Sequence, residues 1–380
     1  MGSRVFRSVV VALVVIGTVV AFVPMAEAGS QSYRVQLDNI APNSEPWAFL
    51  RFFPGSALSI HQGDVLDFAW GGVGTPHTAT VVGDADPAHW RQVNQGSGGA
   101  YESPIPDSQV GGDDHELIEN PKEVAPSDPT CGTVVDPCSF DGTSVVSSGF
   151  HFGDPSAQPS FAVKITAPVG GYAFLCLLHP GMEVQLNVVA DATSVPSPQE
   201  VAATAAQEET QAATVDGAKA DHQAQTVHVV HTTARSIIKV SAGGFSKGVS
   251  ANEYPDNPIV AHVGDRIKLY GTGEIHTGTF PKKAVNTTPF IQTVCEVTGP
   301  DTPATSPADC SDPSKFEIVL NPKAFLPTKS NVLRNPTAFV NSGLGVGSLK
   351  HAFEARKPGV YHFVCLVHGP SMSGTIRIVA

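Results

Sequence analysis

The chain has 380 residues and a formal net charge of −12 at pH 7, and 41% of its residues are hydrophobic. This length exceeds one ordinary hydrophobic core and predicts two domains. The acidic balance argues against nucleic acid and anionic membrane surfaces as partners, because both attract basic proteins. The 36 Gly and 31 Pro, with few long helical patterns, favour many short strands joined by turns.

The N-terminus has the pattern of an export signal. Arg4 and Arg7 precede an apolar run over 9–23, and Ala26-Glu27-Ala28 fits a small-x-small cleavage site. The run is shorter than the roughly 20 residues of a membrane-spanning helix; an uncleaved anchor is the alternative interpretation. We therefore expect residues 1–28 to be a signal peptide, and the mature chain to be secreted to an extracytoplasmic location, periplasm or cell surface, without a membrane span.

The first predicted domain covers residues 29–190 and opens with short strand patterns. Residues 57–61 and 65–70 predict a hairpin around a Gly-Asp turn. Residues 84–145 are an insertion rich in Asp, Pro and Gly, longer than a compact domain needs. No residue spacing in this insertion predicts a site.

Residues 170–182 read Gly-Gly-Tyr-Ala-Phe-Leu-Cys-Leu-Leu-His-Pro-Gly-Met. A strand would point the tyrosine, the phenylalanine and Cys176 to one face, and the next residues form a loop that carries His179 and Met182. One further histidine would complete the trigonal His₂Cys site with a weak axial Met that blue copper prefers. His77, in the Gly-rich segment after the hairpin, is the candidate.

Residues 191–225 are rich in Ala, Thr, Gln and Glu and contain no aromatic residue, so we predict an interdomain linker. Ser197 and Glu200 fit a capping box with a proline at the first helical position. A short helix to about Thr214 is expected, which alone would be only marginally stable.

The second predicted domain, residues 226–380, repeats these landmarks. It has a Gly-Asp hairpin at 258–269, and residues 359–372 read Gly-Val-Tyr-His-Phe-Val-Cys-Leu-Val-His-Gly-Pro-Ser-Met. A repeat with this many matched landmarks is a strong signal. The corresponding candidate ligands are His276, Cys365, His368 and Met372.

Alternative interpretations concern the cysteines and the other histidines. Cys176 and Cys365 could be small hydrophobic residues of buried strands, but two complete ligand sets favour metal sites. His61 and His262, beside the hairpin turns, are interpreted as structural. No spacing links the remaining candidates to a shared site: His89, His115, His151, His228, His231 and His362.

On these motifs the chain resembles the cupredoxins, specifically plastocyanin- and amicyanin-like bacterial blue copper domains. The spacing Cys176-x₂-His179-x₂-Met182 matches the short amicyanin-type loop, whereas Met372 lies one residue further from its histidine. The resemblance covers most of both domains apart from their insertions. It implies an all-β fold of two tandem cupredoxin-like antiparallel Greek-key β-sandwiches, each with one type 1 copper ion. It also implies that the edge of each loop histidine is an electron port within an apolar docking patch.

The four other cysteines lie in the insertion 84–145 and in a second insertion, residues 281–337. Export permits them to form disulfides. Four cysteines allow three pairings. Proximity and domain separation favour Cys131 with Cys138 and Cys295 with Cys310. A four-cysteine zinc site is the alternative, which the spacings fit poorly.

We predict an electron-transfer protein, not an enzyme, that exchanges single electrons with redox partner proteins of unknown identity. Multicopper oxidases need His-x-His pairs and a His-Cys-His run, and two-domain nitrite reductases place a histidine directly before the Cys ligand. Here Leu175 and Val364 occupy that position. Three alternatives remain open: copper storage or delivery, a structural or adhesion module stabilised by copper, and a reductase or oxidase with an intermolecular second site.

Overall fold

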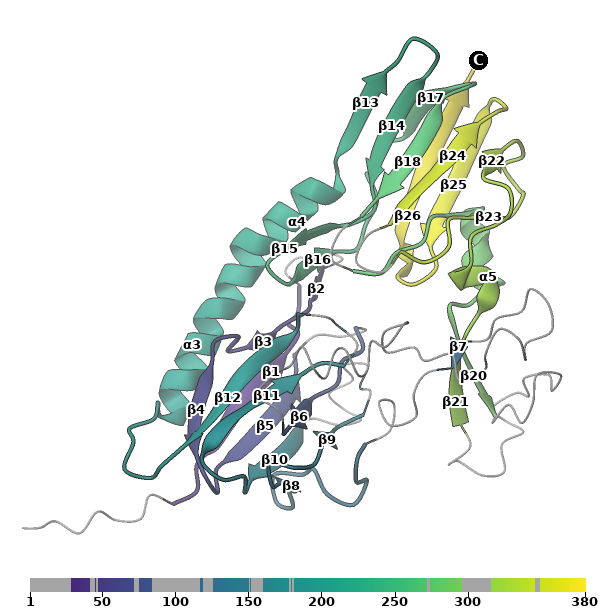
Figure 1. The fold of residues 1–380 in the computed structure, drawn as a ribbon. Coiled ribbons are helices and arrows are strands. Elements are labelled where there is room, and N and C mark those ends of the chain that lie inside the picture. Colours follow the sequence, from purple (N-terminus) through teal and green to yellow (C-terminus); the bar gives the residue numbers. More distant parts are fainter. Residues whose placement is uncertain are drawn as a thin grey trace, which may run out of the picture.

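The computed structural model describes residues 29–41, 45, 47–71, 75–83, 117–118, 126–149, 151, 160–177, 179, 181–271, 274–295, 316–345 and 349–380. Two β-regions follow one another, and a long helix leads from the first to the second (Figure 1). The predicted signal peptide, residues 1–28, lies outside the described residues. The predicted domain boundaries stay a prediction.

The first β-region is built from two five-stranded sheets. One sheet has the order β3 (Phe52–Phe53), β1 (Ser32–Leu37), β5 (Val65–Trp70), β10 (Phe161–Ile165) and β8 (Cys138–Phe140). The other has the order β4 (Leu58–His61), β12 (Glu183–Val189), β11 (Gly170–Leu175), β6 (Thr80–Val82) and β9 (Val146–Ser147).

Alternation along the strands fills the core between these sheets. In β1, Tyr33, Val35 and Leu37 are buried while their neighbours along the strand are more exposed, as the two-residue period of a strand requires. Phe174 of β11 packs edge-on against Phe68 of β5, with ring centroids 5.3 Å apart. The core therefore joins the hairpin strand β5 to β11, the strand that ends just before Cys176.

The second β-region repeats this plan. One sheet has the order β13 (Val227–His231), β14 (Ser236–Ser241), β18 (Arg266–Tyr270), β24 (Lys350–Ala355) and β22 (Val332–Leu333). The other has the order β17 (Ile259–His262), β26 (Gly369–Val379), β25 (Gly359–Cys365), β19 (Thr279–Phe280) and β23 (Val340–Asn341). Two short helical turns, η3 (Lys282–Asn286) and α5 (Pro322–Phe325), lie between β19 and β22.

The prediction of two tandem β-sandwiches is confirmed, with one difference in strand direction. Not every pair is antiparallel: β1 runs parallel to β5, and β12 runs parallel to β4. The same parallel pairs recur as β14 with β18 and β17 with β26. β1 and β14 thus lie beside β5 and β18, which are not their neighbours in sequence, and hairpin signals cannot predict such pairs.

Two small sheets connect the halves of the chain. One consists of β15 (Gly244–Ser246), β16 (Val249–Ala251) and β2 (Trp47–Phe49), so a strand of the first half pairs with a strand of the second. The other consists of β20 (Ile291–Cys295), β21 (Phe316–Leu320) and β7 (Leu117–Ile118). The two β-regions are therefore joined by backbone hydrogen bonds as well as by the chain.

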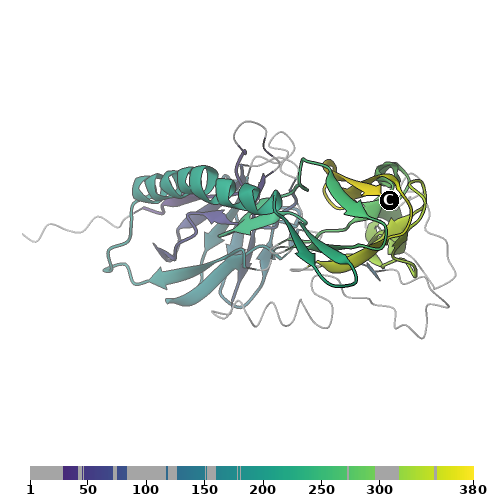
Figure 2. The same ribbon diagram turned by 90° about the horizontal axis from the view of Figure 1, so that it is seen from above.

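The predicted linker helix is longer and more firmly packed than the sequence suggested. It comprises α3 (Pro198–Gln211), a π-helical turn η2 (Ala212–Asp216) and α4 (Gly217–Ala224), and the predicted capping box of Ser197 and Glu200 is present. Figure 2 shows α3 lying along the first β-region. Small residues let the helix approach closely: Ala205 and Ala212 share an apolar cluster with Phe49 and Val249.

The disulfide predictions have different outcomes. Cys131 and Cys138 form a disulfide, as expected. Cys310, and therefore its predicted bond to Cys295, lies outside the described residues. Within the part of the chain that the structure describes, no helix has the length and apolar character needed to cross a membrane.

Candidate metal centres

The first cluster forms where three segments of the first β-region meet. His77 lies between β5 and β6, Cys176 follows β11, and His179 lies in the loop before β12. Nδ1 of His77 is 3.9 Å from the sulfur of Cys176, and Nδ1 of His179 is 3.5 Å from it. The two Nδ1 atoms are 3.2 Å apart. All three predicted donors therefore face one point.

Backbone and hydroxyl groups fix the position of the thiol. The N–H of Thr78 points at the sulfur of Cys176 at 3.4 Å, and the hydroxyl of Thr78 accepts from the N–H of Leu177 at 2.8 Å. The N–H of Cys176 donates to the carbonyl of Met182, which closes the loop. Thr78, the residue after His77, therefore contacts both the sulfur of Cys176 and the backbone that follows it.

The second cluster has the same construction. His276, Cys365 and His368 bring one donor atom each within 4.8 Å of one another, as do the three residues of the first cluster. Nδ1 of His368 is 3.5 Å from the sulfur of Cys365. Thr277 repeats the contacts of Thr78: its N–H is 3.4 Å from that sulfur, and its hydroxyl accepts from the N–H of Leu366.

The residues of both clusters fit a metal ion. His77 and His276 are fully buried, and both ring nitrogens of His276 have no hydrogen-bond partner. A buried polar atom without a partner is costly, and a metal bond to one ring nitrogen would relieve that cost. Two imidazoles and a thiolate match copper or zinc, and a Met as weak further ligand favours copper.

Both predicted axial methionines are buried. Met182 belongs to the apolar cluster that contains Cys176, and Met372 belongs to the cluster that contains Cys365. Where the second loop begins, the pairing of β25 with β26 shifts register between Val364 and Cys365. Their role as axial ligands stays a prediction.

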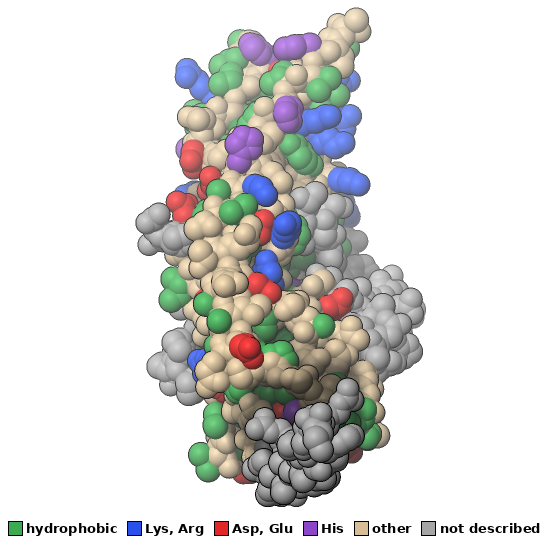
Figure 3. Space-filling model, turned by 90° about the vertical axis from the view of Figure 1, so that its left-hand side faces the viewer, with side chains coloured by type: hydrophobic (Ala, Val, Ile, Leu, Met, Phe, Trp, Pro, Cys, Tyr) green, Lys and Arg blue, Asp and Glu red, His purple; other side chains and the backbone are tan. Residues whose placement is uncertain are grey.

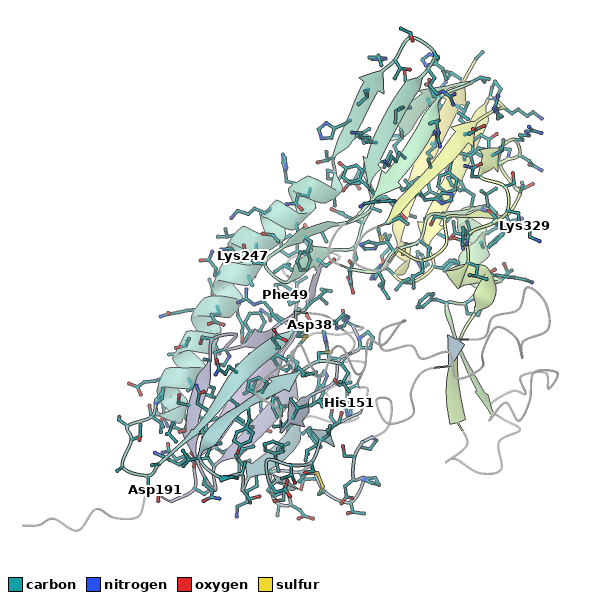
Figure 4. The ribbon with its side chains drawn as sticks, viewed as in Figure 1. Asp38, Phe49, His151, Asp191, Lys247 and Lys329 are labelled. Carbon is teal, nitrogen blue, oxygen red and sulfur yellow. A yellow bond between two sulfur atoms is a disulfide. The ribbon has the colours of Figure 1, made fainter. Side chains whose placement is uncertain are left out.

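A carboxylate that sequence reasoning missed lies behind the first cluster. Oδ2 of Asp38 is 3.2 Å from Nε2 of His77, and Asp38 is buried. Asp38 lies at the end of the first β-region that faces the second (Figure 4). Alignment of the two Gly-Asp hairpins through their parallel strand pairs puts Gly243 at the corresponding position. A Cβ atom there would lie 2.6 Å from Nε2 of His276.

Electrostatics within the clusters favour thiolates. Burial acts to raise the pKa of the Cys176 thiol, but His179 and His77 hold it well below its ordinary value. The Cys365 thiol is affected in the same way by His368 and His276. Burial acts to lower the pKa of His77, but hydrogen bonds to Asp38 and Cys176 raise it to about 10. The electrostatics of both clusters therefore favour the thiolate form that a metal requires.

A second carboxylate that sequence reasoning missed lies between the clusters. Oε1 of Glu274 is 3.7 Å from Nε2 of His179, and Oε2 is 3.4 Å from Nε2 of His368. Burial acts to raise the pKa of Glu274, but the neighbouring ligand histidines hold it well below its usual range. The edges of both loop histidines thus face the same carboxylate. This differs from the open, apolar port that the resemblance implied.

The other histidines lie apart from the clusters, except one. His151 exchanges two backbone hydrogen bonds with His77, and its ring lies 4.5 Å from that of Trp70, so it helps to position His77. Figure 3 shows histidines gathered toward the second β-region on the face along which the helix runs. His61, His228, His231, His262 and His362 take no part in either cluster, and His89 and His115 lie outside the described residues.

No protein-family model matches the chain, and no curated protein matches it in sequence. Among solved structures it is similar to dithionite-reduced auracyanin from the photosynthetic bacterium Roseiflexus castenholzii, at 16% identity over 43% of this chain and 99% of that chain, with a TM-score of 0.25. Plastocyanin from Dryopteris crassirhizoma is similar at 18% identity over 41% of this chain and 99% of that chain, with a TM-score of 0.18. Blue copper oxidase from Nitrosomonas europaea is similar at 12% identity over 92% of this chain and 86% of that chain, with a TM-score of 0.18.

These similarities are too distant to support a conclusion about activity. The architecture and the clusters are the stronger observations. Each half of the chain is a two-sheet β-sandwich that brings a His-Cys-His group together. The predicted arrangement of two β-sandwiches, each with one His-Cys-His group, is therefore present.

Proposed function

We propose that the protein is a one-electron carrier with a type 1 copper ion in each domain. The observation that carries this proposal is the pair of His-Cys-His clusters with their donor atoms already converged. His77, Cys176 and His179 would hold one ion, and His276, Cys365 and His368 the other. Met182 and Met372 would be the weak axial ligands. Copper in such a site supplies reversible one-electron chemistry between Cu(I) and Cu(II).

The surrounding chain suits that chemistry. The N–H groups of Thr78 and Thr277 point at the two sulfurs, which spreads negative charge and tunes the reduction potential. Both cysteines are buried, so water has little access to the thiolates. The strands on either side of each loop hold the donors in place, which keeps structural change small when the charge of the site changes.

Electron transfer is favoured over catalysis by the residues beside the cysteines. Leu175 and Leu177 flank Cys176, and Val364 and Leu366 flank Cys365. Neither cysteine therefore has the adjacent histidine through which multicopper oxidases and nitrite reductases reach a second copper site. Purified copper-loaded protein should show no copper-dependent turnover of oxygen or nitrite with an artificial donor. Sustained turnover would contradict the proposal.

The direct test is copper content and colour. Metal analysis should give two copper ions per chain, with visible absorption from thiolate-to-copper charge transfer. Cys176→Ser and Cys365→Ser should each remove one ion and one absorption component, and the double variant should be colourless and folded. A single copper per chain, unaffected by Cys365→Ser, would mean that the second domain is a degenerate repeat.

Reversible cycling separates an electron carrier from the alternatives. A copper storage or delivery protein would bind and release the metal without a reversible one-electron transition. A module that copper merely stabilises would melt at a higher temperature with copper but would show no functional potential. Either result, metal release without a reversible transition or stabilisation without a functional potential, would contradict the carrier proposal.

Location and partners also belong to this proposal. The Cys131–Cys138 disulfide fits an oxidising compartment, as does the predicted signal peptide. We infer an extracytoplasmic protein that exchanges electrons with redox partner proteins. Export would be tested by fractionation of the native host and N-terminal sequencing, which should find a mature chain that begins after Ala28.

A further inference from the structure

The two ligand loops meet at one buried carboxylate. Glu274 has one oxygen 3.7 Å from Nε2 of His179 and the other 3.4 Å from Nε2 of His368. The side chains of Glu274, His179 and His368 are 6, 11 and 14% exposed. A carboxylate so far removed from water needs compensating partners, and here the partners come from both domains.

The orientation of the two rings links this contact to the metal clusters. In each loop histidine, Nδ1 faces the cysteine of its own cluster at 3.5 Å, while Nε2 faces Glu274. The two imidazoles and the carboxylate thus form an unbroken row from one sulfur to the other.

The fold itself does not require the carboxylate. Glu274 stands two residues before His276, and Thr75 stands two residues before His77 in the first repeat. The first sandwich therefore folds with a threonine at this position. The second has Glu274 there, and its carboxylate contacts His179 in the ligand loop of the first. Glu274 can contact both ligand loops only when the two domains lie together.

Other contacts keep the domains together. β2 pairs with β16 across the domain boundary. Phe49 of the first domain, Ala205 of the helix and Val249 of the second domain share one buried cluster. The position of Glu274 between the loops is therefore supported by a continuous interface.

We propose that Glu274 is a positioning residue that holds His179 and His368 edge to edge, so that electrons pass between the two metal sites within one molecule. This proposal rests on the carrier function proposed above. In the exchange, one electron leaves the first site, which is oxidised, and enters the second, which is reduced. No bond forms or breaks, and no proton or further reactant is consumed.

The test uses the full copper-loaded chain. A pulse-generated radical supplies less than one electron per molecule, and absorption then follows redistribution between the sites. Wild-type protein should show a first-order phase that is independent of protein concentration and absent from Cys176→Ser and Cys365→Ser. Glu274→Gln and Glu274→Thr should keep both copper ions and slow this phase roughly tenfold or more, because small displacements strongly affect reactions between positioned groups.

Glu208→Gln is the matched control. Glu208 also reaches another part of the chain, lying 3.8 Å from Arg51, but it belongs to neither cluster. The variant should redistribute electrons at the wild-type rate. Wild-type rates in both Glu274 variants, or a phase whose rate grows with protein concentration, would overturn the proposal.

A second measurement needs no metal. Hydrogen exchange of the metal-free protein should become faster in both ligand loops, residues 176–182 and 365–372, when Glu274 is replaced by Gln. Unchanged exchange in residues 176–182 would show that Glu274 supports only its own domain and would overturn the proposal. Failure of the carrier function would be seen separately, as a wild-type protein without a reversible one-electron transition.

Discussion

The carboxylate of Asp38 lies 3.2 Å from Nε2 of His77, and both side chains are buried. Gly243 takes the corresponding place in the second domain, where Nε2 of His276 has no hydrogen-bond partner. A carboxylate behind a metal-bound histidine makes the histidine a stronger ligand and stabilises the more positive metal. The two sites are therefore chemically different, and the first should have the lower reduction potential.

Asp38→Asn should raise the potential of the first site by roughly 60 mV, which is a tenfold change in a one-electron equilibrium. The amide keeps an oxygen that can accept from the N–H of Phe49, as Asp38 does, so the loop should keep its shape. Spectroelectrochemistry in the Cys365→Ser background measures the first site alone. Asp67→Asn removes a carboxylate that pairs with Arg34 and should leave the potential unchanged. A potential that stays constant or falls in Asp38→Asn would contradict the assignment.

The metal-free protein should be most stable over a plateau of pH. Each cluster has one histidine with a pKa raised to about 10, His77 or His368, and one cysteine with a lowered pKa. The histidine contribution to stability is complete below the unfolded pKa of 6.5 and is lost as pH rises through about 10. The thiolate contribution is complete above the unfolded pKa of 9.0 and is lost as pH falls toward the lowered pKa.

These two dependences oppose each other between pH 6.5 and pH 9.0. The thermal midpoint, followed by circular dichroism, should therefore be nearly constant in this window and should fall on both sides of it. The double variant Cys176→Ser/Cys365→Ser lacks the thiolate contribution, so its midpoint should fall continuously as pH rises above 6.5. A double variant with the wild-type plateau would show that the thiolates do not stabilise the folded protein.

The close approach of the helix to the first domain should be sensitive to one methyl group. A Cβ atom at Gly217 would clash with the ring of Trp47, so Gly217→Ala must displace the helix or the tryptophan. Overpacking of this kind costs about 1–3 kcal/mol, despite the higher helix propensity of Ala. Chemical denaturation should show the loss. Lys219→Ala, at an exposed position on the same helix, should leave stability nearly unchanged, and equal stability of the two variants would contradict the prediction.

The disulfide prediction can be tested by mapping peptides from folded protein treated with an alkylating agent. Cys131 should be linked to Cys138, as in the structure, and Cys295 should be linked to Cys310. Cys176 and Cys365 should be recovered as free thiols in the metal-free protein, as the structure has them. Any peptide that links Cys176 or Cys365 to another cysteine would conflict with both the pairing and the metal sites.

The parts of the molecule that depend on local residue spacing could be predicted from the sequence. Cys176 and His179 are three residues apart, and strand alternation sets the direction of the side chains near them. The repeat then located His276 and His368 by correspondence. The structure brings these donors together because each domain folds its two sheets around the same landmarks.

The contacts that sequence reasoning missed join residues without a fixed spacing. Asp38 precedes His77 by 39 residues and directly follows β1, whose parallel pairing with β5 has no local signal in the sequence. Glu274 meets His179 across a domain interface, which no pattern within one repeat can predict. The length and stability of the linker helix could not be predicted either. Its buried alanines stabilise it only by packing against the folded domains.

The pairing of β2 with β16 has a consequence for how this chain could be divided. If residues 226–380 were produced alone, β16 would lose its partner along Trp47–Phe49 and would expose an open strand edge. Val249 and Ala251, which are fully buried, would become exposed to water. Open edges of this kind recruit other chains, so the separated half should self-associate. The two halves are repeats in sequence, but they should fold as a single unit, and a cut between them should yield aggregates rather than two separately folded halves.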